Sequence, residues 1–193
     1  MNRAEKKEQR RVALLEGALA VLTAHGLEGF TTGRIAAEAG IAQSGFYKYW
    51  PDRDAALRAV AEHLGEQALR SIREARLAAG GRIDQLSNSF AGGLEAMLQH
   101  HRTVTLFLRF RREPGPLGDV FRGLVERAHQ ELETDMVRMG LVPAGDPWAG
   151  RLAFYVVTLC IGAVEGLVDG RLDDVQRVAD DLGRIAASVL GAR

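Results

Sequence analysis

Apolar residues return at helical spacing along almost the entire chain. Between Leu14 and Leu22 they recur every three or four residues, which predicts a helix over about residues 7–24 that ends at Gly26. The same spacing persists to a final stripe from Val175 to Leu190. No stretch alternates with period two for long enough to predict a strand. The pattern therefore predicts an all-α protein of about nine helices.

Capping and breaking residues divide this pattern into segments. Thr31 or Thr32 can cap a second helix that ends at Gly40, and Asp52 can cap a long helix that ends at Gly80-Gly81. The remaining helices are predicted over residues 43–49, 83–99, 103–112, 117–139, 148–168 and 175–190. Two short helices therefore follow the first long one.

Residues 27–57 contain a short helix, a three-residue turn and a second short helix. Ile35 and Ala36 face inward, Gly40 supplies the positive φ of the turn, and Ile41 lies beneath it. This arrangement is typical of a helix-turn-helix, although an ordinary pair of packed helices needs no more. The second short helix carries the hydrogen-bonding residues Gln43, Ser44, Tyr47, Lys48 and Tyr49. A helix built only for packing would not need them, which favours DNA binding.

A series of short motifs runs through the same segment. In order they are Phe30-Thr31-Thr32, Ile35-Ala36, Ala39-Gly40-Ile41, Phe46-Tyr47, Tyr49-Trp50, and Asp52-Arg53-Asp54 followed by Leu57. Together they resemble the tetracycline-repressor (TetR) family of bacterial transcriptional regulators. The resemblance covers about the first 60 residues, and the rest of the chain matches only in helix number and order.

The resemblance also implies roles for individual residues. Base contacts would fall to Gln43, Ser44 and Gly45, and phosphate contacts to Thr32, Tyr47, Lys48, Tyr49 and Arg53. Gln can form two hydrogen bonds to adenine, whereas Lys, Arg and Tyr suit phosphate oxygens. Two positions depart from the family. Ala42 stands where a serine cap is common, and Gly33 stands where some members contact a base, which leaves Arg34 as a weaker substitute.

For the architecture, the resemblance implies a homodimer on a double-stranded DNA operator. It places the helix-turn-helix domain in residues 1–52 and an effector-binding and dimerisation domain in residues 53–193. The last two helices would form a four-helix bundle with their symmetry mates, and the nearly all-apolar segment 152–168 needs such cover. The expected interface residues on the last helix are Val175, Val178, Leu182, Ile185 and Val189.

Large apolar side chains also gather on the middle helices, where core packing alone would explain each of them. Because the family keeps an effector pocket there, we expect a small hydrophobic effector in a pocket lined by Phe90, Met97, Phe107, Phe110, Phe121 and Tyr155. The candidate polar anchors are His101, Arg109, Tyr155 and Thr158. Arg109 lies in an apolar run, where its cation either reaches outward or meets an anionic group.

Composition and motifs exclude several other classes. Lys plus Arg equals Asp plus Glu at 25 each, so the whole chain has no cationic attraction to nucleic acid or membrane. The single Cys160 excludes an internal disulfide and a CxxC site, which favours the cytoplasm. The most apolar run, residues 152–164, is shorter than the roughly 20 residues that a membrane-spanning helix needs. We expect no catalytic residue, metal or cofactor, because the adjacent His100 and His101 point apart and no catalytic motif occurs.

These observations favour a cytoplasmic, ligand-responsive DNA-binding regulator, most simply a repressor that a hydrophobic effector releases from a palindromic operator. The alternative is a DNA-binding protein without an effector that a partner protein controls, and a fully packed carboxy-terminal core would favour it. An enzyme would require a cleft with convergent titratable groups.

Overall fold

The computed structural model describes residues 3–79 and 85–191, which form nine α-helices and no strand. The helices are α1 (Arg3–Gly29), α2 (Thr32–Glu38), α3 (Gln43–Phe46), α4 (Arg53–Ala78), α5 (Leu86–Gln99), α6 (His101–Phe110), α7 (Pro116–Arg138), α8 (Trp148–Val168) and α9 (Val175–Gly191). The all-α prediction is confirmed. The predicted break at Gly80-Gly81 lies outside the described residues.

The helix boundaries follow local chemistry in the amino-terminal part. Gly26 interrupts α1 with a φ of 62°, where the sequence predicts its end. The Thr31 hydroxyl accepts a hydrogen bond from the Arg34 amide at 3.3 Å and caps α2. The Asp52 carboxylate accepts one from the Ala55 amide at 2.7 Å and caps α4. Regular helix in α3 ends at residue 46, earlier than the predicted residue 49, and residues 47–49 form a turn.

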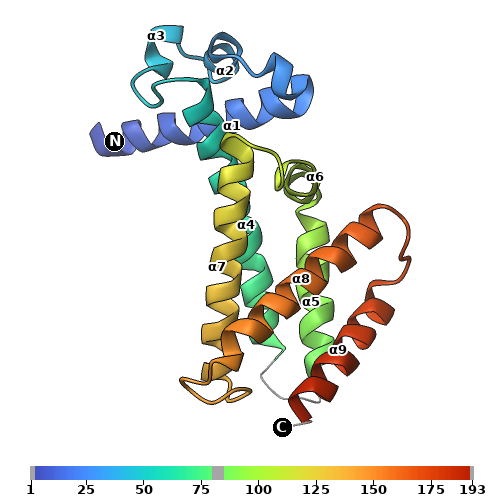
Figure 1. Ribbon diagram of the computed structural model, residues 1–193. Coiled ribbons are helices and arrows are strands. Elements are labelled where there is room, and N and C mark those ends of the chain that lie inside the picture. Colours follow the sequence, from blue (N-terminus) through green and yellow to red (C-terminus); the bar gives the residue numbers. More distant parts are fainter. Residues whose placement is uncertain (1–2, 80–84, 192–193) are drawn as a thin grey trace.

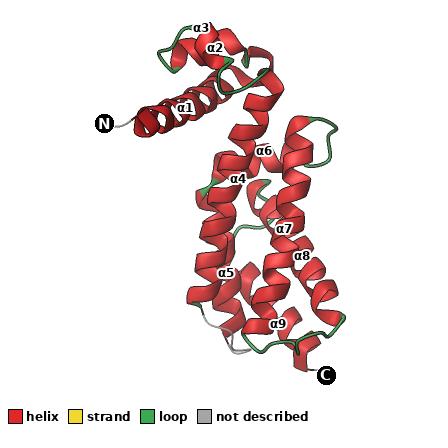
Figure 2. Ribbon diagram, turned by 90° about the vertical axis from the view of Figure 1, so that its left-hand side faces the viewer, coloured by secondary structure: helices red, strands yellow, loops and turns green. Residues whose placement is uncertain are grey.

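Helices α1–α3 form one end of the molecule, and α4 leads from them into the remaining helices (Figure 1). Seen from the side, α4 forms the connection between the two parts (Figure 2). The core of the first part includes Leu14, Phe30, Ile35, Phe46 and Trp50, together with Leu57, Val60 and Leu64 of α4 and Leu117, Phe121 and Leu124 of α7. This core therefore extends past residue 52, and it ties the amino-terminal helices to α4 and α7.

Two further cores hold the carboxy-terminal helices together. One joins α5, α6, α8 and α9 through Ala91, Leu94, Val104, Val164, Ala179 and Leu182, and the other joins α7 and α8 through Leu132, Met136, Leu152 and Ala153. The approach of α4 to α7 depends on Gly65, because a Cβ there would lie 2.1 Å from the Leu124 Cδ1 atom. Any larger residue at this position of α4 would therefore force the Leu124 side chain of α7 to move.

Helix α8 exposes much of its apolar surface. The sequence predicts no membrane-spanning helix, because residues 152–164 are too few to cross a bilayer. That argument is wrong, because α8 has 21 residues and, by length and composition alone, is long and apolar enough to cross a membrane. An apolar segment of α1, Glu8–Gly29, meets the same criterion. Core helices of water-soluble proteins also do so. Only 28% of the apolar window of α8 is buried, and Phe154, Tyr155 and Leu159 are 43–52% exposed. The apolar face of α8 thus lacks cover within one chain.

Candidate DNA-binding surface and effector pocket

The recognition helix α3 is linked to α2 by polar side chains. The Gln43 amide Nε2 donates to the Thr32 hydroxyl at 3.1 Å, and the Tyr47 hydroxyl lies 3.4 Å from the same oxygen. A Cβ at Gly33 would lie 3.9 Å from Gln43 Nε2, an ordinary contact distance, so this hydrogen bond does not depend on the glycine. Gln43, Tyr47 and Lys48 are exposed. The structure thus brings together three of the predicted contact residues, Thr32, Gln43 and Tyr47, and the exposed Lys48 follows Tyr47 in the chain.

Both arginines of the predicted DNA surface are bound to backbone carbonyls. Arg53 donates from Nε to the Phe30 carbonyl at 2.8 Å and from Nη2 to the Leu27 carbonyl at 2.6 Å. Arg34 donates from Nη1 to the Gly29 carbonyl at 3.3 Å. These bonds satisfy carbonyls at and just after the end of α1, and they fix the start of α4 through Arg53 and the start of α2 through Arg34. In this structure the two side chains hold the domain together, a role that the sequence did not indicate.

The remaining predicted DNA contacts differ in exposure. Ser44 is exposed, whereas Tyr49 is half-buried and packs against the first core. Gly45 is half-buried, and a Cβ there would lie 3.3 Å from the Ile41 Cδ1 atom, so this glycine also lets Ile41 pack beneath the turn. Ala42 begins α3 without a side-chain cap, as its side chain predicts. On α3 and the turn after it, the exposed predicted contacts are therefore Gln43, Ser44, Tyr47 and Lys48.

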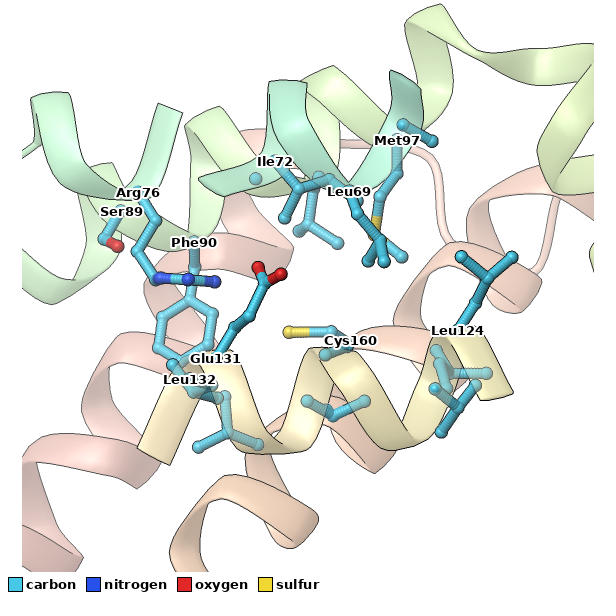
Figure 3. A pocket seen from close by; sticks show the side chains of 18 of the residues that line it. Leu69, Ile72, Arg76, Ser89, Phe90, Met97, Leu124, Glu131, Leu132 and Cys160 are labelled. Carbon is cyan, nitrogen blue, oxygen red and sulfur yellow. The ribbon is translucent and has the colours of Figure 1, made fainter. Parts of the chain in front are cut away.

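A cavity of about 190 Å³ lies between the helices of the carboxy-terminal part. Its lining comes from α4 through α9, and of the predicted residues it includes Phe90, Met97, Phe107 and Phe121. Figure 3 shows Leu69, Ile72, Met97 and Leu124 around it, with Arg76, Ser89 and Glu131 gathered toward one end. For comparison, an apolar cavity of roughly 150 Å³ holds a benzene molecule. The cavity thus has room for a small apolar ligand.

Five residues predicted for the pocket lie elsewhere. Arg109 and Phe110 line a separate hollow beside residues 113–118, where the Arg109 guanidinium lies 5.0 Å from the centre of the Phe110 ring. Tyr155 and Thr158 are exposed on the outer face of α8. His101 is exposed at the start of α6. None of the five lines the cavity, so these predictions are corrected: four of the side chains are exposed, and Phe110 is half-buried against the first core.

Sequence reasoning missed a buried carboxylate that is bound to Arg76, one of the residues that line the cavity. Asp135 of α7 is fully buried, and its carboxylate accepts hydrogen bonds from Arg73 of α4 at 3.1 and 3.2 Å. Arg76 of α4 and Arg138 of α7 also donate to it. Burial alone would raise the pKa of Asp135, but the hydrogen bonds from Arg73 and Arg76 outweigh it and hold the pKa below its usual value. Asp135 therefore joins α4 to α7 as a carboxylate.

Cys160 also lines the cavity. Burial raises the pKa of its thiol to about 12. At neutral pH this side chain is a protonated, weakly polar part of the wall and not a thiolate nucleophile.

The expected interface residues of α9 are also divided by the structure. Leu182 is only 7% exposed and packs in the core with Ala91 and Leu94, because α9 lies against α5. Its prediction as a dimer contact is therefore corrected. Val175 and Val178 are half-buried against the same core, and Val189 is half-buried against the third core. Ile185 is 48% exposed and remains available to a second chain.

A helix-turn-helix with an exposed polar recognition helix defines a DNA-binding protein, and comparisons with known proteins agree. Residues 14–65 match the model of the bacterial regulatory proteins of the tetR family. No curated protein sequence matches the chain.

Solved structures share the fold over nearly the whole chain. A transcriptional regulator from Pseudomonas aeruginosa PAO1 is 21% identical, with 96% of this chain and 92% of that one covered and a TM-score of 0.71. The TetR family repressor AlkX from Dietzia sp., implicated in biodegradation of n-alkanes, is 21% identical, with coverage of 94% and 95% and a TM-score of 0.62. The fatty acid degradation regulator FadR from Bacillus halodurans is 13% identical, with coverage of 92% and 97% and a TM-score of 0.66.

Residues 14–65 are thus similar to the DNA-binding domain of TetR-family transcriptional regulators, and nearly the whole chain shares the fold of solved proteins of that kind. Proteins of this family bind DNA and dimerise, and they are transcription factors and not enzymes.

Proposed function

We propose that this chain is a cytoplasmic repressor that binds a palindromic operator as a homodimer and leaves it when a small hydrophobic effector occupies the cavity. Residues 1–52 would bind DNA, and residues 53–193 would bind the effector and the second subunit. The observation that carries the proposal is the apolar cavity itself. A sealed core would instead have favoured the effector-free alternative.

The position of α4 supports a link between cavity and DNA. Its first half contributes Leu57 and Val60 to the core of the DNA-binding end, and its second half contributes Leu69 and Ile72 to the cavity wall. A ligand that favours one position of α4 therefore biases the position of the DNA-binding end. It can do so only by as much as its affinities for the two arrangements differ. The names of AlkX and FadR, which refer to n-alkanes and fatty acids, suggest long apolar compounds for the first trials.

The DNA side of the proposal predicts different effects for two neighbouring residues. Lys48→Ala should weaken binding to all duplexes and reduce the salt dependence by about one unit, because one phosphate contact is lost. Gln43→Ala should instead relax the preference at one base pair of each half-site, a discrimination of about 1–3 kcal/mol. Selection from random duplexes, followed by titration at several salt concentrations, measures both. Selection that returns no palindromic site would contradict the proposal.

The effector side predicts that filling the cavity abolishes the response to ligand. Ala128 lines the cavity from α7, so Ala128→Phe should place a ring in the ligand volume and leave operator affinity within about twofold. Thr134→Phe, at an exposed position of the same helix, is the matched control. Fluorescence anisotropy of a labelled operator measures release by a panel of apolar compounds. If no compound releases the unmodified protein, or if Ala128→Phe responds like the control, the effector role is wrong.

A further inference from the structure

We propose that the cavity holds an elongated apolar ligand ending in one carboxylate, and that Arg76 binds this group. The inference rests on the proposed function of the cavity and names the chemical class of its ligand. Four observations support it: the distribution of polar residues that line the cavity, the hydrogen bonds of Arg76, the net charge of the side chains around Asp135, and the elongated shape of the apolar part of the cavity.

The polar groups of the wall are unevenly distributed. Arg76, Ser89 and Glu131 lie at one end of the cavity, while Met97 and Leu124 lie at the other (Figure 3). The Arg76 side chain extends into the space between the flanking helices in this view. Thr103 and Cys160 also line the cavity, but Arg76 is the one cationic side chain among the described residues that line it. A ligand with a single anionic end therefore finds a cationic partner in one place.

Arg76 retains hydrogen-bonding capacity at this end. It donates from Nη2 to the Asp135 carboxylate, and its side chain is 15% exposed. Its Nε atom is buried and has no hydrogen-bond partner among the described residues. A buried donor without a partner is unfavourable, and a charged guanidinium binds carboxylates through paired N–H groups. A small turn of the guanidinium toward the cavity gives Nε an acceptor on the ligand.

The local charge selects an anion. The guanidinium groups of Arg73, Arg76 and Arg138 surround the carboxylate of Asp135, and Glu131 lies 3.9 Å from Arg73. Three positive and two negative charges leave a net charge of +1 at this end. One ligand carboxylate beside the largely buried Arg76 neutralises that charge, whereas an ammonium group would increase it.

The apolar part of the cavity is long. On α4 its lining extends from Gly65 to Arg76, a rise of about 16 Å along the helix. Leu69 and Ile72 lie between these ends, and the facing wall includes Val125 and Ala128 of α7. An unbranched hydrocarbon chain fits this shape better than a broad ring system.

The first test uses the unmodified protein and three probes of equal chain length: decanoate, decanol and decylamine. Isothermal titration calorimetry should show decanoate binding about tenfold tighter than the other two, since a charge-assisted hydrogen bond distinguishes it. Equal affinity for decanoate and decanol, tighter binding of decylamine, or no binding of any probe would overturn the proposal. The proposed function is judged separately, by operator release with the wider panel.

The second test compares two arginines that bind the same carboxylate. Arg76→Lys keeps a cation beside Asp135 but removes Nε, and should lower decanoate affinity about tenfold while leaving decanol affinity unchanged. Arg73→Lys also replaces a partner of Asp135, but Arg73 does not line the cavity, so decanoate affinity should be preserved. Equal effects of the two changes would contradict a role for Arg76. If Arg76→Lys does not fold, the probe comparison on the unmodified protein still decides the question.

Discussion

Leu159→Asp is expected to convert the dimer to monomers and to weaken operator binding by about 100-fold or more. Leu159 is 43% exposed on α8, next to the exposed rings of Phe154 and Tyr155, which lie 5.9 Å apart. In a two-fold interface formed by this face, each change places a carboxylate in an apolar contact, and the two copies double the effect. Operator affinity falls because a monomer engages one half-site and loses the benefit of a linked second site.

Leu77→Asp is the matched control for this prediction. Leu77 is 37% exposed on α4, so the change introduces the same charge at a comparable position outside α8 and α9. Multi-angle light scattering should give a dimer for the control and a monomer for Leu159→Asp, with circular dichroism to confirm that both are folded. If Leu159→Asp remains a dimer with normal operator affinity, the subunit interface lies on another face.

The sequence predicted the helices well because their ends depend on nearby residues. Gly26, Thr31, Gly40 and Asp52 each determine a boundary through φ or a capping bond, and the structure has boundaries at or beside all four. The helix-turn-helix was recognisable for the same reason. Its packing residues and its exposed polar residues lie within one short, continuous segment.

Side-chain direction in the carboxy-terminal helices was harder to predict. Helix α8 is apolar on nearly every side, so no stripe distinguishes the residues that face the cavity from those that face outward. The clustering of large apolar residues predicts Tyr155 in the pocket, yet it is 48% exposed. On α9 a single apolar stripe was assigned to the second subunit, but it covers α5 of the same chain and buries Leu182. Periodicity identifies an apolar face without identifying its partner.

One feature of the site did leave a signal in the sequence. The inward positions of α7 are Leu117, Phe121, Leu124, Ala128 and Leu132, at spacings of three or four residues. Asp135 occupies the next position of this stripe, where an apolar residue is expected. An acidic residue on a buried face requires a basic partner, which Arg73 and Arg76 of α4 supply in the structure. The pairing itself depends on how α4 packs on α7, which the spacing alone does not determine.

Asp135→Asn is expected to lower the free energy of unfolding at pH 7 by about 3 kcal/mol, which corresponds to a fall in Tm of roughly 6–12 °C. The change keeps the shape of the side chain but removes the charge that pairs with Arg73, Arg76 and Arg138. This loss of stability is at the low end for a broken buried ion pair, because Arg73 and Arg138 are partly exposed and water can still solvate them when the carboxylate is removed. Asp181→Asn is the control, since its ion pair with Arg184 is exposed and should contribute little.

The pH dependence of this difference tests its electrostatic origin. The pKa of Asp135 is lowered in the folded chain, so the unfolded chain takes up a proton first as the pH falls. The stability due to Asp135 is therefore fully present above the ordinary carboxyl pKa of about 4, and it is lost as the pH falls through the lower folded value. Thermal unfolding of the unmodified protein and of Asp135→Asn should show a large Tm difference at pH 7 that narrows below about pH 4. A difference that stays constant over this range would mean that Asp135 acts through packing and not through its charge.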